Sequence, residues 1–339
     1  MKVRYLIWGF MFCCLFVMFG CDSKNTISEQ ESSSCLGIME EKREKAVNTQ
    51  DVDTTECIYL DEIRNYIGVT SDVDTQSTFS VAIIDSGVFP HEALENRIIA
   101  FRDFVYDKSM PYDDSGHGTQ IAGIIAGKSE TFTGLCPNAK VIGLKVLDVN
   151  NKGKTSDIIE ALQWVLDNKD LYNIRVVNMS IGFDVISDEL VTTCRKVCEE
   201  GIIVVSAAGN NTGEIRQGIN IENIILVGSV EYDSYRNEVK KASYSNDSDI
   251  YTFGTNIYTI DSNTTYKGNI GEKIFNNNNY ITVTGTSYSS AIMTGYVCDV
   301  LSQEEEESLD CIMEMLFQTD LFIFDEKNNK FPVLKRRNN

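Results

Sequence analysis

An aspartate, a histidine and a serine each lie in a short glycine-containing string, and they follow one another as Asp85, His117 and Ser287. The strings are IIDSG, DSGHGT and GTSYSSA. A serine hydroxyl is a poor nucleophile at neutral pH, so it needs an imidazole to accept its proton and a carboxylate to orient that imidazole. The three residues therefore predict a serine hydrolase with Ser287 as nucleophile, His117 as base and Asp85 as the orienting group.

Asn210 is a fourth candidate, because the negative charge that develops on a substrate carbonyl needs preorganised donors. Asn210 ends the string SAAGN, where its side-chain amide and the backbone N–H of Ser287 can form an oxyanion hole. Without the triad, an Asn after Ala-Gly is typical of an ordinary turn. The other histidine, His91, lies in a turn-like stretch, VFPHEAL, that favours a structural or exposed role. His117 is therefore the candidate base.

Alternating strand-like and helix-like runs must position these side chains. Short runs rich in β-branched residues suit strands buried on both faces, over 79–85, 140–147, 174–181, 201–208 and 223–230. Helical patterns lie over 118–127, 155–168, 187–200 and 287–301. The alternation predicts a three-layer α/β fold, a mostly parallel central sheet with helices on both faces. Asp85 then falls at the carboxyl end of a strand, where open α/β sheets bind ligands.

The amino terminus predicts export from the cytoplasm. Lys2 and Arg4 precede an apolar run that ends at Gly20 and Cys21, so we expect a signal peptide of the lipoprotein type over 1–21. Cys21 would then become the lipidated first residue and anchor the protein to the outer face of the bacterial cytoplasmic membrane. An uncleaved anchor and ordinary secretion stay open as alternatives.

Composition predicts the other boundaries. Residues 22–53 are polar and lack the apolar content of a core, which predicts a spacer or short pro-segment. We expect the catalytic domain over 54–325 and a polar tail over 326–339. Inside the domain, residues 231–280 are polar and rich in Asn, which predicts surface loops and edge ribbons.

The charge and the cysteines exclude two classes of function. The formal net charge is −20, from 50 acidic and 30 basic residues, which argues against nucleic-acid binding. A well-solvated acidic surface explains this charge, and steering of basic substrates is the alternative. Cys194 and Cys198 are one helical turn apart, but a zinc site would need two further ligands nearby. We therefore assign no metal ligand.

Together the strings resemble those of the subtilisin-like serine peptidases, the subtilases. The resemblance extends to NMSIG at 178–182 and LCPNAKVIGLKVL at 135–147, and it covers residues 55–320. It implies an endopeptidase that cleaves peptide bonds through an acyl-enzyme on Ser287, with a peptide or protein as substrate and no required cofactor. Ala93 stands where the family has a calcium-binding Asp, so a structural calcium ion stays open.

The resemblance also implies where a substrate binds. An extended peptide would pair with the backbone at the end of the strand that carries NMSIG. The implied substrate-binding residues are Ser180, Ile181, Gly182 and Phe183.

Several positions in the sequence depart from the family pattern. Gln120 replaces the common second His, Ala291 and Ile292 replace a Pro-His pair, and Phe183 stands where a Gly is frequent. These departures favour restricted specificity, such as maturation of a secreted peptide, and leader removal from a lanthipeptide precursor is one concrete version. A general secreted protein-degrading enzyme and a catalytically silent peptide-binding module are the alternatives.

Overall fold

The computed structural model describes residues 57–69, 79–183, 185–211, 224–233, 238–262, 275–276, 280–303, 309–324 and 330–335. All of them belong to one compact unit, Val52–Asn339. The expected signal peptide, Cys21 and the spacer over 22–53 lie outside the described residues. Within the described part, no helix has the length and apolar character needed to cross a membrane.

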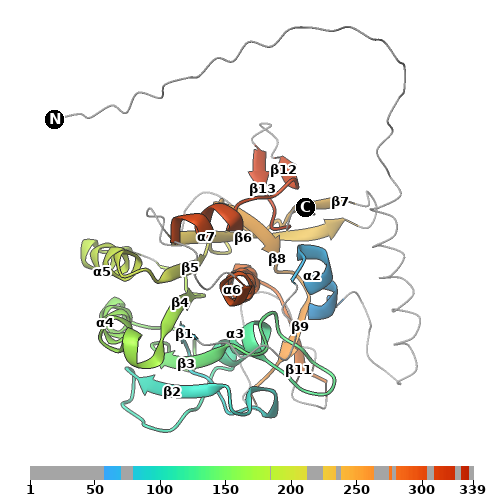
Figure 1. The fold of residues 1–339 in the computed structure, drawn as a ribbon. Helices are drawn as coiled ribbons and strands as arrows, with labels where there is room; N and C mark the ends of the chain where they lie inside the picture. Colours follow the sequence, from blue (N-terminus) through green and yellow to red (C-terminus); the bar gives the residue numbers. More distant parts are fainter. Residues whose placement is uncertain are drawn as a thin grey trace, which may run out of the picture. The chain divides into compact units, whose positions relative to one another are not determined.

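A sheet of eight strands forms the middle of the described fold (Figure 1). The strands are β1 (Ser80–Asp85), β2 (Ile98–Asp103), β3 (Lys140–Lys145), β4 (Ile174–Met179), β5 (Ile203–Ala207), β6 (Ile224–Asp233), β7 (Glu238–Lys241) and β8 (Ile250–Phe253). Their order is β2-β3-β1-β4-β5-β6-β7, and β8 pairs with β6. All neighbours are parallel except β6 and β7. The five predicted strand runs correspond to β1, β3, β4, β5 and β6.

Helices cover both faces of this sheet. They are α2 (Leu60–Ile67), the 3₁₀ helix η1 (Glu92–Leu94), α3 (His117–Ala126), α4 (Thr155–Tyr172), α5 (Asp188–Glu199), α6 (Thr286–Gln303) and α7 (Leu309–Leu316). Side chains alternate along β1: Val81 and Ile83 join the core with α3 and α6, whereas Ala82 and Ile84 join the core with α4 and α5. The predicted three-layer α/β fold is confirmed.

Helix α6 is enclosed by the core. Its side chains are buried over nearly the whole length to Leu301, because β4, β5, β6, β8 and α3 all pack against it. Figure 1 shows α6 near the centre of the fold. Ser287 therefore stands in the first turn of a helix that the core holds in place.

The prediction of surface loops and edge ribbons over 231–280 fits β7, which pairs antiparallel at the end of the strand order, and is wrong for the buried strands that follow it. Strand β8 joins the main sheet, and Tyr251 is fully buried. A small antiparallel sheet contains β9 (Ile257–Ile260), β10 (Phe275–Asn276) and β11 (Tyr280–Val283). Strands β8 and β9 have four residues each, so their apolar pattern is short and polar neighbours obscure it in the sequence.

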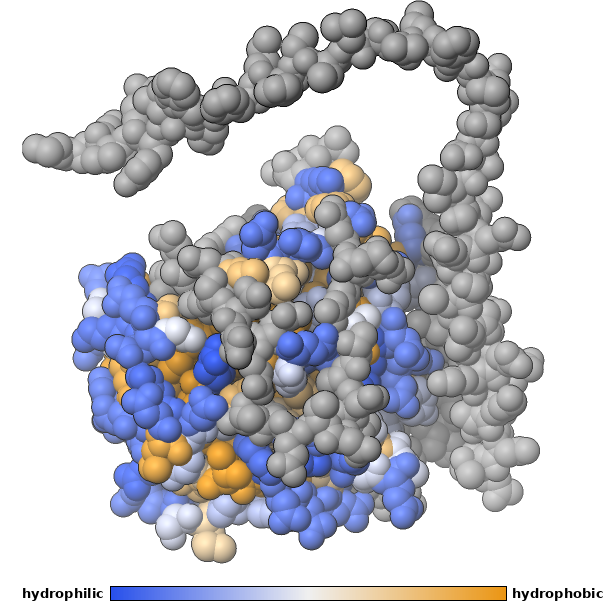
Figure 2. All heavy atoms as spheres, in the orientation of Figure 1, coloured by the Kyte–Doolittle hydropathy of each residue, from blue (hydrophilic) through white to orange (hydrophobic). Residues whose placement is uncertain are grey.

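The predicted polar tail over 326–339 is also wrong where it is described. Strands β12 (Phe322–Phe324) and β13 (Lys330–Pro332) form an antiparallel pair. Val333 and Leu334 are buried, and Leu334 N–H donates to the Tyr251 carbonyl at 2.7 Å. The apolar string FPVL returns to the core although charged residues follow it. The face drawn in Figure 2 shows many hydrophilic residues, with hydrophobic areas between them.

Candidate active site

Asp85 and His117 meet at the carboxyl edge of the sheet. Asp85 ends β1, His117 begins α3, and His117 Nδ1 lies 2.8 Å from Asp85 Oδ1. The Asp85 side chain is fully buried, and that of His117 is 12% exposed. Helix α3 can approach so closely because Gly118 has no side chain; a Cβ there would collide with the Gly87 carbonyl oxygen. Glycines at 87 and 118 thus let the candidate base and the candidate orienting carboxylate come together.

Two opposing effects set the pKa of His117. Burial lowers that pKa because it disfavours the charged imidazolium. The charge and hydrogen bond of Asp85, with a further contribution from the charge of Asp113, raise it and prevail. The pKa of His117 is therefore raised above its ordinary value, so the imidazole is a stronger base than an isolated histidine.

Asp113 holds this corner together, a role that sequence reasoning missed. Its Oδ1 accepts from Ser86 Oγ at 2.9 Å, from Gly116 N at 2.8 Å and from Ser115 N at 3.1 Å. Its Oδ2 accepts from the Thr119 backbone at 2.9 Å and from the Thr119 hydroxyl at 2.6 Å. Burial raises the pKa of Asp113. An Asp four positions before the candidate base, ahead of a helix start, was the available signal.

Ser287 lies in the first turn of α6, but its hydroxyl is not bonded to the base. Ser287 Oγ donates to the Ser180 carbonyl at 3.1 Å, and no hydrogen bond to His117 is found in the described part of the chain. The Ser180 hydroxyl in turn lies 2.9 Å from the Ser287 carbonyl and 2.8 Å from Ser290 Oγ. Asn178 Nδ2 donates to the same hydroxyl at 2.8 Å. The nucleophile candidate and the end of β4 are therefore fixed to each other.

Asn210 follows β5 and is held by one side of its carboxamide. Its Oδ1 accepts from the Thr286 backbone N–H at 2.9 Å and from Thr286 Oγ1 at 3.0 Å. The Thr286 hydroxyl also accepts from Gly209 N at 3.1 Å. With Oδ1 engaged in this way, Nδ2 is the group that can donate to a ligand beside Ser287. Thr286 is a second residue that sequence reasoning missed, and its position in GTS was the signal.

The four predicted substrate-binding residues follow directly from β4. Ser180 and Ile181 are buried, whereas Gly182 is exposed and presents its backbone to solvent. Phe183 is 7% exposed and packs in the core cluster that contains α4 and α5. The Phe183 side chain therefore packs on the face of the sheet that α4 and α5 cover.

The departures from the family pattern have packing partners. Gln120 Nε2 donates to Asp261 Oδ1 at 3.0 Å, and Gln120 Oε1 accepts from the Tyr288 hydroxyl at 2.8 Å. Ala291 and Ile292 are fully buried along α6.

His91 is buried and caps η1, where its Nδ1 accepts from Ala93 N at 3.0 Å. Of the two roles expected for His91, structural or exposed, the exposed one is therefore wrong. The Ala93 methyl group is buried and offers no carboxylate, so this position does not fit the calcium ligand of the family. Among the described residues, no cluster of three His, Cys, Asp or Glu side chains could hold a metal ion. Burial raises the pKa of Cys194 to about 12 and that of Cys198 to about 11, which disfavours thiolates.

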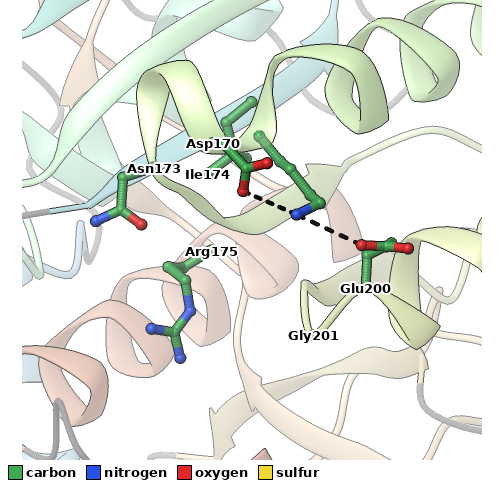
Figure 3. A pocket seen from close by; sticks show the side chains of 7 residues that line it. Asp170, Asn173, Ile174, Arg175, Glu200 and Gly201 are labelled. Atoms are coloured by element: carbon green, nitrogen blue, oxygen red, sulfur yellow. Dashed lines mark hydrogen bonds and ion pairs between the residues drawn. The ribbon is translucent and has the colours of Figure 1, made fainter.

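A separate pocket of about 280 Å³ lies at the opposite edge of the sheet, where β4 begins (Figure 3). Lys169 Nζ lies 2.8 Å from Asp170 and 3.4 Å from Glu200, and Arg175 also lines the pocket. None of the predicted site residues lines it.

The model of the subtilase family matches residues 76–327. The chain belongs to the subtilase family. This subtilase is 32% identical over 266 residues to "Serine protease AprX" of Bacillus subtilis (strain 168), which covers 70% of this chain and 60% of that protein. It is 28% identical over 249 residues to "Thermostable alkaline protease" of Halalkalibacterium halodurans, with 72% of this chain and 62% of that protein covered. The match thus spans about three fifths of each relative.

A solved structure has a similar fold. The "Crystal structure of a cold adapted subtilisin-like serine proteinase" superposes with a TM-score of 0.64 and 23% identity, over 80% of this subtilase and 94% of that chain. At this level of identity the likeness shows a subtilisin-like fold.

Proposed function

We propose that this subtilase is a serine endopeptidase in which Ser287 attacks the substrate, His117 moves the protons and Asp85 orients His117. The observation that carries the proposal is the 2.8 Å hydrogen bond between His117 Nδ1 and buried Asp85, together with the position of Ser287 in the first turn of α6, a helix held by the core. That bond fixes the tautomer in which Nε2 faces away from Asp85 and is free to accept a proton.

The reaction begins with a change in one hydrogen bond. Ser287 Oγ turns from the Ser180 carbonyl to Nε2 of His117, a step that substrate binding would favour because the peptide backbone competes for the Ser180 carbonyl. As the Oγ–carbon bond forms, the hydroxyl proton passes to Nε2. His117 then gives this proton to the leaving amine as the carbon–nitrogen bond breaks. Water, deprotonated by His117, hydrolyses the resulting ester and restores Ser287.

Attack by Ser287 places negative charge on the oxygen of the substrate carbonyl. The side chain of Asn210 and the backbone N–H of Ser287 would stabilise this oxyanion. Thr286 holds Asn210 Oδ1 through two hydrogen bonds, so Nδ2 needs little reorganisation when charge develops. The Ser287 N–H belongs to the first turn of α6, where helix N–H groups lack helical partners and the positive end of the helix dipole favours an anion. Both donors are thus prepared before the substrate arrives.

The proposed substrates are particular secreted peptides or proteins, cleaved outside the cytoplasm. Export and a lipid anchor at Cys21 follow from the signal-like amino terminus. We base restricted specificity on the departures from the family pattern in the sequence at Gln120, Ala291 and Phe183, all three of which have buried side chains. Leader removal from a lanthipeptide precursor is the specific form that we propose.

Mass spectrometry of a peptide library incubated with this subtilase tests the proposal. We expect a small set of cleaved sequences from the wild type and none from Ser287→Ala, which loses only the nucleophilic oxygen. Cleavage of most peptides would contradict restricted specificity while retaining the endopeptidase. Equal cleavage by wild type and Ser287→Ala would contradict the mechanism. Mass analysis of the mature amino terminus, with Cys21→Ala as the control, tests lipidation.

A further inference from the structure

A buried side-chain bridge joins the helix that begins with His117 to the helix that carries Ser287. The Tyr288 hydroxyl donates to Gln120 Oε1 at 2.8 Å. Tyr288 directly follows Ser287 on α6, and Gln120 lies three residues after His117 on α3. The bridge thus connects the residue that follows Ser287 to a residue that lies about one helical turn after His117.

The Gln120 end of the bridge is fixed from several sides. Gln120 Nε2 donates to Asp261 Oδ1 at 3.0 Å, and the backbone carbonyl of Gln120 accepts from Thr259 Oγ1 at 2.9 Å. Gln120 is 2% exposed and Asp261 is 5% exposed. A Cβ on Gly116, the residue before His117, would lie 3.1 Å from Asp261 Oδ1, so Asp261 packs against the start of α3. The Gln120 carboxamide therefore has one defined orientation, with Oε1 toward Tyr288.

The Tyr288 end of the bridge contacts the base itself. The Tyr288 and His117 rings have centroids 5.7 Å apart and planes inclined at 55°. Tyr288 is 8% exposed, and its backbone N–H donates to the Gly285 carbonyl at 3.0 Å. A buried ring with a tethered hydroxyl has little freedom, so it limits rotation of the neighbouring imidazole.

We propose that Tyr288 and Gln120 are a positioning pair that keeps the His117 imidazole aligned with Ser287. The pair does not touch substrate. It acts by fixing the distance between the first turns of α3 and α6, and by packing the Tyr288 ring against His117. Because Ser287 Oγ must turn toward Nε2 before it reacts, a displaced imidazole would slow proton transfer without weakening ligand binding. This inference rests on the proposed serine endopeptidase function.

Inactivation kinetics with a fluorophosphonate probe test the pair without knowledge of the natural substrate. The limiting rate, kinact, reports attack by Ser287, and KI reports binding of the probe. For Tyr288→Phe we expect kinact to fall about five- to tenfold, the size expected for one lost hydrogen bond, with KI unchanged. Gln120→Met, which has a side chain of similar length, should cause a similar fall. The double variant should be no slower than either single variant, because both remove the same bridge.

Tyr251→Phe is the matched control, since it removes one hydroxyl from a buried tyrosine elsewhere in the domain. We expect its kinact to equal that of the wild type. The inference is overturned if Tyr288→Phe retains wild-type kinact, if it changes only KI, or if the losses in the double variant multiply. Failure of the wild type to react at Ser287 would overturn the proposed function and the positioning role with it. Normal wild-type labelling with unaffected Tyr288→Phe would overturn the positioning role alone.

Discussion

The two ends of β4 differ in whether their polar side chains are buried or exposed. At the carboxyl end, Asn178 and Ser180 are buried, and their side chains bond to one another and to α6. At the amino end, Arg175, Lys169 and Glu200 line a pocket where the ion pairs of Lys169 are partly exposed (Figure 3). Buried hydrogen bonds fix geometry because no water competes for them, whereas exposed ion pairs are screened. The difference indicates that the more ordered polar contacts of β4 lie at the edge where the proposed chemistry occurs.

The largest change should come from the orienting carboxylate at the buried edge. Asp85→Asn keeps the shape but lets the amide favour the wrong tautomer of His117. We expect the rate of reaction at Ser287 to fall by about 10⁴, with the thermal unfolding midpoint close to that of the wild type. Inactivation kinetics and a thermal melt measure both quantities. A variant that retained a tenth of the wild-type rate would show that Asp85 does not orient the base.

The next largest change should come from Asn210→Ala. It removes the side-chain donor from the proposed oxyanion hole and leaves Thr286 without its acceptor. Turnover of a cleaved library peptide should slow by about 10²–10³, with KM little changed. An unaltered kcat would refute the oxyanion assignment.

The pH dependence of reaction at Ser287 should report His117. The base must be neutral to accept a proton, and its pKa is raised by Asp85 and Asp113 against the opposing effect of burial. The rate should therefore fall as pH decreases through a midpoint above about 6.5, the ordinary value for histidine. Measuring kinact/KI from pH 5 to pH 9 tests this expectation. A midpoint below the ordinary value would mean that burial outweighs the carboxylates.

The smallest change should come from the other end of β4. Lys169→Ala removes both ion pairs of Lys169 in the second pocket. We expect the denaturant midpoint and kinact/KI to match those of the wild type, because exposed ion pairs contribute little. A clear loss of reactivity would indicate that the two edges are coupled and would weaken the contrast between them.

Short motifs in the sequence predicted the residues of the candidate site. Asp85, His117, Ser287 and Asn210 each lie beside residues that reveal their backbone setting, and the β-branched runs predicted the parallel strands. The contacts that surround these residues could not be predicted from the sequence, because they join residues far apart in the chain. The bond from Gln120 to Asp261 spans 141 positions, and nothing local to either residue indicates the other.

The wrong prediction for strands β8 and β9 has a related cause. Strands β8 and β9 carry the strings IYTF and IYTI inside a polar, Asn-rich segment, and each is too short to dominate a composition window. Burial of Tyr251 depends on β6 and on the residues after β13, which bring apolar partners from elsewhere. Average polarity therefore predicted surface loops and edge ribbons where tertiary packing formed buried strands.

The most direct test of the central claim is to locate the covalent adduct of a fluorophosphonate on the folded protein. Peptide mapping by mass spectrometry should find the adduct on Ser287 in the wild type and no adduct in Ser287→Ala. Asp85→Asn should react at the same serine but far more slowly. An unlabelled Ser287 in folded wild-type protein would contradict the account and leave a peptide-binding module in its place.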